Sequence, residues 1–190
     1  MQPSSNSAGE RRIYLDGSMN PKKKNAKAGY GIAEYEVTAE GEKFLSARYG
    51  KVVTSPKHRM FQGATKHTNN AGELTSLIRA IHGELGGKGR ITFIADSMHM
   101  INIATGRTVP SRGKGNANRL LATRVRAAYR LLQYERGSDV NIRHVKSHTG
   151  VRGNEAADKL ANRGADIEEG HPIVERGSTE PPPERHKDNG

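Results

Sequence analysis

The sequence predicts an α/β fold in which a mixed sheet has helices packed against it. The opening third contains three apolar runs separated by loops, as expected of antiparallel strands. The remainder alternates short apolar runs with stretches whose apolar residues recur at helical spacing. Near the middle of the chain, residues 91–95 are apolar on both faces, which is typical of a central strand covered by helices on both sides. Strands followed by alternating strands and helices favour a layered mixed sheet.

The first three predicted strands form an antiparallel meander. In the first, Ile13 and Leu15 alternate with more polar neighbours. Residues 29–37 and 44–53 supply the second and third strands. The turn at 20–25 carries three lysines.

Helices alternate with the remaining strands. Asn70 and Glu73 have capping-box spacing and predict a helix that begins at Asn70 and ends at the glycine pair 86–87. A short helix over 97–104 and a loop over 106–118, rich in Gly, Arg and Lys, follow the strand at 91–95. Apolar residues at helical spacing then predict a helix from about 121 to 132. A strand over 140–145 and a helix over 154–165 complete the domain.

The chain of 190 residues is long enough for one domain with an ordinary core. We expect the folded domain at residues 11–167, between disordered tails at 1–10 and 168–190, since the second tail has too little apolar content to pack. No apolar run approaches the length of a membrane span, so we expect no membrane partner.

Composition narrows the functional classes. The formal net charge of +11 favours a polyanionic partner, of which nucleic acid is the commonest, with a solvated basic surface as the alternative. The absence of cysteine excludes disulfides, thiolate metal sites and cysteine nucleophiles. The N-terminus has no apolar core and is no secretory signal. We expect an intracellular, reducing compartment, cytoplasm or nucleus, with an organelle left open, and a monomeric protein.

Four acidic residues stand where predicted strands end or helices begin: Asp16, Glu73, Asp96 and Asp158. A carboxylate that closes an apolar strand is costly unless a cation compensates it. Four such groups in a basic protein predict a shared divalent site, and their hard oxygens suit Mg²⁺ or Mn²⁺. Two such ions about 3.5–4 Å apart can activate a water and stabilise the leaving oxygen when a phosphodiester is hydrolysed.

Each acid also has an ordinary explanation. Glu73 fits a capping box, and Asp158 fits a surface residue paired with Arg152 or Arg163. The two strand-end aspartates fit a turn and a helix N-cap. Only the set of four favours a metal site.

Four motifs together resemble type 1 ribonucleases H, in the family's order, over about residues 12–166: Asp16-Gly17-Ser18, residues 68–74 (TNNAGEL), Asp96-Ser97, and His148-Thr149-Gly150 through residues 154–161 (NEAADKLA). The resemblance implies a ribonuclease H-like mixed sheet of five strands, three antiparallel and then two parallel. It also implies endonucleolytic cleavage of the RNA strand of RNA–DNA hybrids with two Mg²⁺ ions, leaving 5′-phosphate and 3′-hydroxyl ends.

The resemblance also assigns roles to residues of this sequence. The four acids match the metal-binding acids, and His148 matches a histidine on a mobile loop, whose motion Gly150 and Gly153 would permit. Matching or chemically suitable positions for substrate contacts are Gly17, Ser18, Asn20, Lys66, Thr68, Asn69, Asn70 and Asn154. Of these, the pair Lys66 and Thr68 looks like the pocket for a phosphate of the DNA strand. Helix capping is the alternative explanation for Asn69 and Asn70.

One departure from the family concerns the contact with DNA. Many members carry a tryptophan-bearing basic protrusion after the third acid, and this chain has no tryptophan. Its corresponding loop keeps Arg107, Arg112 and Lys114. We therefore expect electrostatic contact with strong salt dependence. The alternatives to an active enzyme are a non-catalytic hybrid-binding module, a DNA-cutting relative of the same superfamily, and a domain of a reverse transcriptase.

Overall fold

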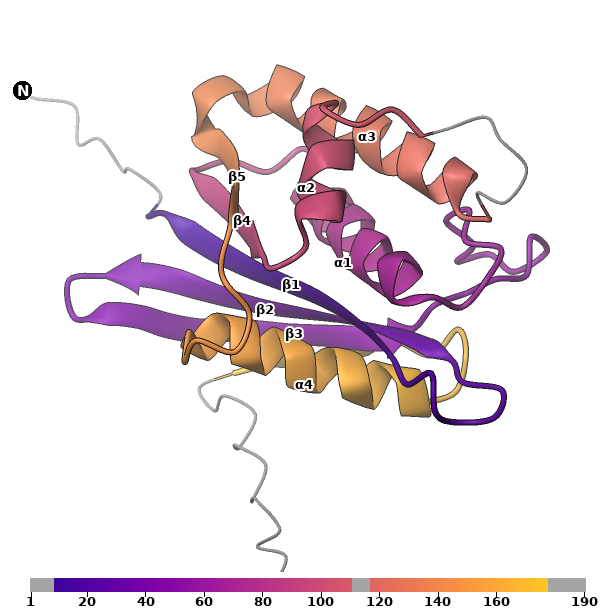
Figure 1. The fold of residues 1–190 in the computed structure, drawn as a ribbon. Coiled ribbons are helices and arrows are strands. Elements are labelled where there is room, and N and C mark those ends of the chain that lie inside the picture. The colour runs from indigo at the N-terminus through magenta and orange to yellow at the C-terminus, as the bar shows by residue number, and fades with distance from the viewer. Residues whose placement is uncertain (1–8, 111–116, 178–190) are drawn as a thin grey trace, which may run out of the picture.

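A computed structural model describes residues 9–110 and 117–177, and Figure 1 shows a single sheet with helices on both faces. The strands are β1 (Arg11–Met19), β2 (Ala28–Thr38), β3 (Gly41–Lys51), β4 (Ile91–Ala95), β5 (Val140–His144) and β6 (Ile173–Arg176). The helices are α1 (Asn69–Glu84), α2 (Met98–Thr105), α3 (Arg119–Arg136) and α4 (Arg152–Asp166), with a short 3₁₀ turn at Gly137–Asp139.

The strand order is β5-β4-β1-β2-β3-β6. β1 to β3 pair antiparallel, and β4 and β5 run parallel to β1. This confirms the predicted α/β class and the predicted directions of the first five strands.

The predicted count of five strands is corrected by β6, which lies inside the segment that we expected to be a tail. It pairs antiparallel with β3, from Ser46↔Arg176 to Tyr49↔Ile173. All four of its residues are exposed. β6 is held by backbone pairing with β3. Because none of its residues is buried, its sequence carries no alternation of apolar and polar residues that could have predicted it.

The sheet has an apolar layer on each face, and each layer is covered by different helices. α1, α2 and α3 cover one face, where Phe93 of β4 meets Tyr129 of α3 edge-on. α4 covers the other, where Tyr14 and Tyr35 make a second edge-on pair. Ile13 and Leu15 are fully buried in the first layer and Tyr14 in the second, so the alternation predicted for the first strand is confirmed.

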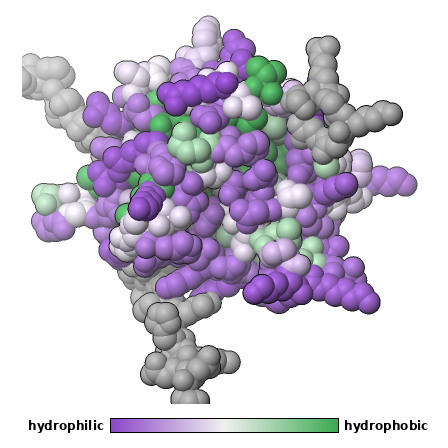
Figure 2. Space-filling model, in the orientation of Figure 1, coloured by the Kyte–Doolittle hydropathy of each residue, from purple (hydrophilic) through white to green (hydrophobic). Residues whose placement is uncertain are grey.

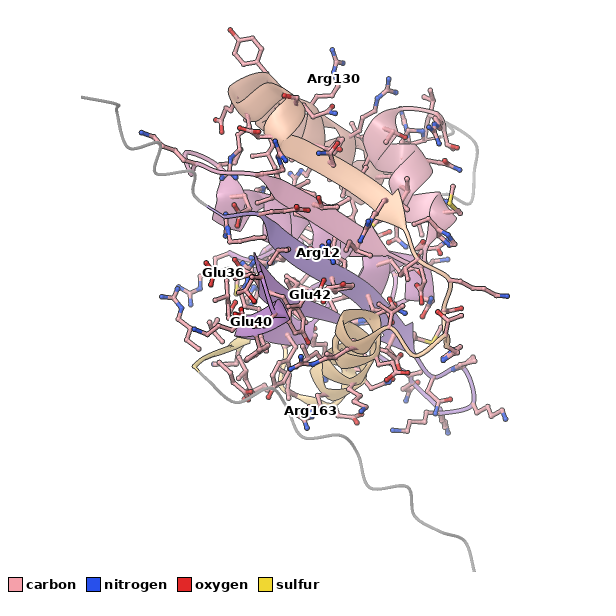
Figure 3. The ribbon with its side chains drawn as sticks, turned by 90° about the vertical axis from the view of Figure 1, so that its left-hand side faces the viewer. Arg12, Glu36, Glu40, Glu42, Arg130 and Arg163 are labelled. Carbon is pink, nitrogen blue, oxygen red and sulfur yellow. The ribbon has the colours of Figure 1, made fainter. Side chains whose placement is uncertain are left out.

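One buried group of charges joins three elements. Glu84 of α1 accepts hydrogen bonds from Arg11 of β1 at 2.6 Å and from Arg136 of α3 at 2.9 Å. The side chains of Glu84 and Arg136 are only 5% and 4% exposed. On the other face of the sheet, Arg12 lies beside Glu42 at 2.7 Å (Figure 3).

The face of the molecule in Figure 2 is mostly hydrophilic, with small separate apolar areas.

Candidate active site

Two of the four acids lie side by side at one edge of the sheet. β1 and β4 are parallel, and their last aligned pair is Leu15 with Ala95, so Asp16 and Asp96 are the next residues on neighbouring strands. β1 itself does not end at Asp16, as we had expected. It continues to Met19 because its pairing with β2 extends that far.

Glu73 reaches this edge from α1. The helix lies very close to β1, since a Cβ placed on Gly17 would come within 2.0 Å of the backbone nitrogen of Glu73. Only glycine allows this approach. The Glu73 side chain is 7% exposed and is fixed at both oxygens, by Asn69 Nδ2 at 2.9 Å and by the hydroxyl of Ser97.

The predicted capping box at the start of α1 is wrong. The N-cap is Thr68, whose hydroxyl accepts a hydrogen bond from the Ala71 backbone nitrogen at 3.0 Å. The helix begins at Asn69, so Glu73 lies in its second turn rather than its first. Likewise, the N-cap of α2 is Ser97 and not Asp96. Neither Glu73 nor Asp96 therefore caps a helix.

α4 contributes the remaining groups. Asn162 Nδ2 donates a hydrogen bond to Asp158 Oδ1 at 3.5 Å, one helical turn away. Asn154, which is 4% exposed, donates from Nδ2 to Asp96 Oδ2 at 3.4 Å. Its Oδ1 is buried and has no partner among the described residues. α4 therefore meets the sheet edge through Asn154 and carries Asp158 on the next turn.

Electrostatics link all four carboxylates. Burial, together with the charges of Asp96, Asp158 and Glu73, raises the pKa of Asp16 to about 8, against the opposing effect of the Gly17 N–H. Burial also raises the pKa of Glu73, with a contribution from Asp96, while hydrogen bonds from neighbouring side chains oppose the rise. The acids that are far apart in sequence therefore act on one another through space.

Among residues 9–110 and 117–177, no three His, Asp or Glu side chains stand close enough together to hold one ion as they are. Strand register brings Asp16 beside Asp96, Ser97 joins Glu73 to the end of β4, and the electrostatic effect of Asp158 on Asp16 relates the fourth acid to them.

The predicted histidine lies in an exposed turn between β5 and α4. His148 has a left-handed φ of 54°, and Gly150 follows with φ 78°. Gly153 was expected to loosen this loop, but it lies inside α4, where an added Cβ would be 2.2 Å from the ring of Tyr14. It is a packing residue. A histidine that sequence analysis missed, His144, has its Nε2 3.2 Å from the backbone oxygen of Asp96.

The expected phosphate pocket has a third member that the sequence did not indicate. Asn118 donates from Nδ2 to Thr68 Oγ1 at 3.0 Å, and its Oδ1 accepts from the backbone nitrogen of Lys66 at 3.5 Å. These three residues and Asn70 line a cavity of about 410 Å³. Asn118 follows a Gly- and Lys-rich stretch of the sequence, and its only signal was its position just before a helix.

The remaining predicted contacts are spread around this edge. Ser18 donates to Asn162 Oδ1, while Asn20 is exposed in the following turn. Arg107 is exposed after α2 and makes no described contact with the acids. Arg112 and Lys114 lie outside the described residues.

A family model of RNase H matches residues 9–166. The chain belongs to the RNase H family. This confirms the resemblance drawn from the motifs, and with it the enzyme class, a ribonuclease H hydrolase. A ribonuclease H of Methylococcus capsulatus is 33% identical over 121 residues, which are 63% of this chain and 75% of that protein.

Several solved structures share the fold. A protease–reverse transcriptase of prototype foamy virus matches with a TM-score of 0.61 and 20% identity, over 85% of this chain and 21% of the viral one. LC11-RNase H1, solved in complex with an RNA/DNA hybrid, matches with a TM-score of 0.55 and 19% identity, over 82% of this chain and 96% of its own. At these identities the likeness supports the fold alone.

Within the described parts of this RNase H, no helix combines the length and apolar character that crossing a membrane requires.

Proposed function

We propose that the protein is an endoribonuclease that cleaves the RNA strand of RNA–DNA hybrids and leaves 5′-phosphate and 3′-hydroxyl ends. The observation that carries the proposal is the meeting of Asp16, Glu73, Asp96 and Asp158 at one edge of the sheet in a chain of the RNase H family. The formal net charge of +11 favours a polyanionic substrate.

In ligand chemistry, the four acids at this edge suit two Mg²⁺ ions, and Mn²⁺ also suits them. All four groups are hard oxygen ligands. Burial and the neighbouring negative charges raise the pKa of Asp16, and a bound cation would offset both effects. The buried Oδ1 of Asn154, for which the described parts of the chain offer no hydrogen-bond partner, adds a further oxygen beside Asp96. When bound, such a metal pair supplies an activated water and stabilises the leaving oxygen.

The protein's own groups would orient the substrate. Asn69 already holds Glu73 Oε1, and with Asn70 it offers amide groups suited to a 2′-hydroxyl, the feature that distinguishes RNA from DNA. Gly17 and Ser18 present backbone and hydroxyl groups next to Asp16. The cavity of Lys66, Thr68 and Asn118 would bind a phosphate of the DNA strand.

The histidine turn gives His148 a separate role. Its exposure and its position before α4 suit a side chain that moves toward the acids to assist proton transfer or product release.

Cleavage of labelled substrates tests the proposal. With Mg²⁺, we expect the protein to cut only the RNA strand of the hybrid, and to spare double-stranded RNA and DNA. EDTA and Asp96→Asn should each lower the rate at least about 100-fold, because EDTA removes the metal and the substitution removes a carboxylate that would position it. Asp139→Asn is the matched control. Asp139 is an exposed acid just before the N-terminal end of β5, whereas Asp96 follows the C-terminal end of the neighbouring strand β4.

The same assay separates the alternatives. Cleavage of double-stranded DNA would indicate a DNA-cutting relative. Tight hybrid binding without any cleavage would indicate a non-catalytic binding module, which the presence of all four acids argues against.

A further inference from the structure

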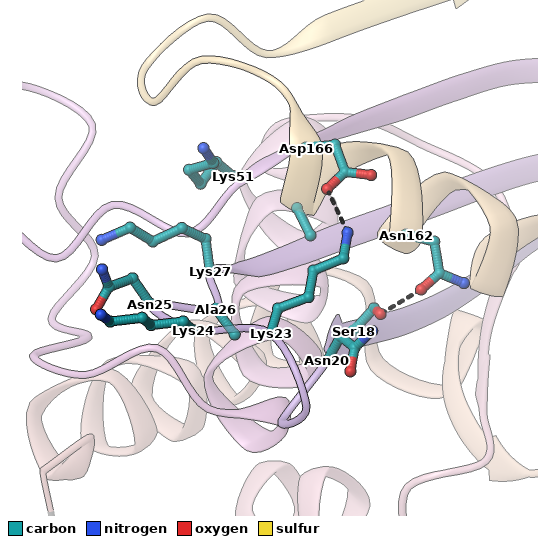
Figure 4. Close-up of a pocket in the computed structure, with 11 residues that line it drawn as sticks. Ser18, Asn20, Lys23, Lys24, Asn25, Ala26, Lys27, Lys51, Asn162 and Asp166 are labelled. Atoms are coloured by element: carbon teal, nitrogen blue, oxygen red, sulfur yellow. Dashed lines mark hydrogen bonds and ion pairs between the residues drawn. The ribbon is translucent and has the colours of Figure 1, made fainter.

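A second cavity, of about 300 Å³, lies between the β1–β2 turn and the C-terminal end of α4 (Figure 4). We call it the lysine pocket. Its lining includes Lys23, Lys24 and Lys27 of the turn, Lys51 at the end of β3, and Asn162 and Asp166 of α4. Neither the four acids nor the cavity of Lys66 and Thr68 forms part of this lining.

The pocket carries an excess of positive charge. Its single acid, Asp166, pairs with Lys23 at 3.5 Å. In the described part of the chain, no carboxylate lies within ion-pair distance of Lys24, Lys27 or Lys51. Figure 4 shows these three lysines on the side of the pocket away from Asn162. Cations held together without counter-charges repel one another, and a bound anion would offset this.

The sheet holds two of the lysines together. Lys27 directly precedes β2, and Lys51 is the last residue of β3, aligned with Gly29. Both also act on the half-buried ring of His67, whose pKa is lowered by burial first and then by their charges, against the opposing charge of Glu169. The closeness of Lys27 and Lys51 is therefore fixed by strand pairing.

The lysine pocket lies next to the edge of the sheet that carries the four acids. Ser18, on the pocket wall, donates to Asn162 Oδ1, and Asn162 in turn donates to Asp158 at 3.5 Å. Asp158, Asn162 and Asp166 are spaced four residues apart along α4. At about 1.5 Å per residue, the pocket lies about 6–12 Å along the helix from Asp158.

We propose that the lysine pocket binds a backbone phosphate of the RNA strand, about two to four nucleotides from the bond that is cut, since each nucleotide advances about 3.4 Å along a duplex. The inference rests on the proposed function. The strand that is cut must cross the acids, and this pocket continues directly from Asp158 through Asn162. Lysines act as point charges on phosphates, so the contact would be independent of sequence.

Salt-dependent binding tests the pocket without relying on turnover. In an Asp96→Asn background, the affinity for a labelled hybrid is measured by fluorescence anisotropy over a range of salt concentrations. Lys27→Ala with Lys51→Ala should lower the log–log salt slope by about 1, because one phosphate contact is lost. The matched control, Lys43→Ala with Lys88→Ala, removes the same charge at the far end of the β2–β3 ladder and before β4, and should leave the slope unchanged.

A charge-preserving pair guards against misfolding. Lys27→Arg with Lys51→Arg should keep the wild-type slope and the wild-type melting temperature. If the alanine pair and the control pair show equal slopes, or if the arginine pair behaves like the alanine pair, the pocket is not a phosphate site.

Neutral methylphosphonates identify the strand. A single one, placed at successive positions near the cleavage site, should weaken wild-type binding at one RNA-strand position and have no further effect on the alanine pair. If the methylphosphonate that weakens wild-type binding but not binding by the alanine pair lies on the DNA strand instead, the assignment to RNA is wrong. A wild-type protein that cuts no hybrid refutes the proposed function. Hybrid cleavage with an unaltered salt slope in the alanine pair refutes the pocket alone.

Discussion

Asp16→Asn should make the metal-free protein more stable while it abolishes activity. The wild-type carboxyl is 7% exposed, faces three other acids, and has its pKa raised from 3.8 to about 8. One pKa unit corresponds to about 1.4 kcal/mol, so ionising Asp16 costs up to about 6 kcal/mol of folding free energy at pH 8 and above. Neighbouring acids share the proton, and the buried amide keeps its own desolvation cost, so we expect a gain of about 2 kcal/mol.

The sign of the effect depends on pH. Between about pH 4 and pH 8 the folded protein binds the Asp16 proton more tightly than the unfolded chain does, so the stability of the wild type falls as pH rises through this window. The asparagine variant lacks this fall. Its advantage should therefore be largest near pH 8 and should shrink toward pH 4.

Thermal unfolding in EDTA measures this difference. For a chain of this size, about 2 kcal/mol corresponds to a rise of about 4–8 °C in Tm. Adding Mg²⁺ should raise the Tm of the wild type more than that of the variant, because a bound ion stabilises only the state that holds it. If the variant melts at or below the wild type at pH 8 in EDTA, burial and neighbouring charge do not destabilise the ionised Asp16, and the reasoning is wrong.

Two substitutions test the packing that supports the site. Gly17→Ala should lower the free energy of unfolding by about 2–3 kcal/mol and reduce cleavage, because its Cβ would meet the Glu73 backbone at 2.0 Å and push α1 from β1; a variant with wild-type stability and rate would contradict this. Glu84→Ala should cost about 3–5 kcal/mol in urea unfolding, because it leaves Arg11 and Arg136 without their shared carboxylate; the exposed Glu155→Ala should cost almost nothing.

Much of the candidate site could be predicted because its signals are local. Asp96 follows an apolar run that is buried throughout, and burial on both faces leaves a direct record in residue type. Asp16 follows alternating residues of a strand whose two faces meet different helices. Motif spacing then grouped these acids with Glu73 and Asp158.

Errors arose where two local explanations fit the same residues. Asn70 and Glu73 have capping-box spacing, yet Thr68 caps the helix because Asn118, fifty residues away, holds the Thr68 hydroxyl in place. Gly153 looks like a loop glycine, and only the ring of Tyr14 against it shows that it packs. No pattern within a few residues distinguishes these cases.

The amino-acid order by itself determined the types and limits of most elements, the excess of positive charge, and the acids at the ends of apolar runs, because periodicity and composition reflect burial residue by residue. Only the tertiary structure decided that Lys27 stands beside Lys51, that β6 completes the sheet, and that Asn118 joins Lys66 and Thr68. These contacts depend on strand register and helix packing, which bring distant segments together through backbone hydrogen bonds and shape rather than through any local pattern.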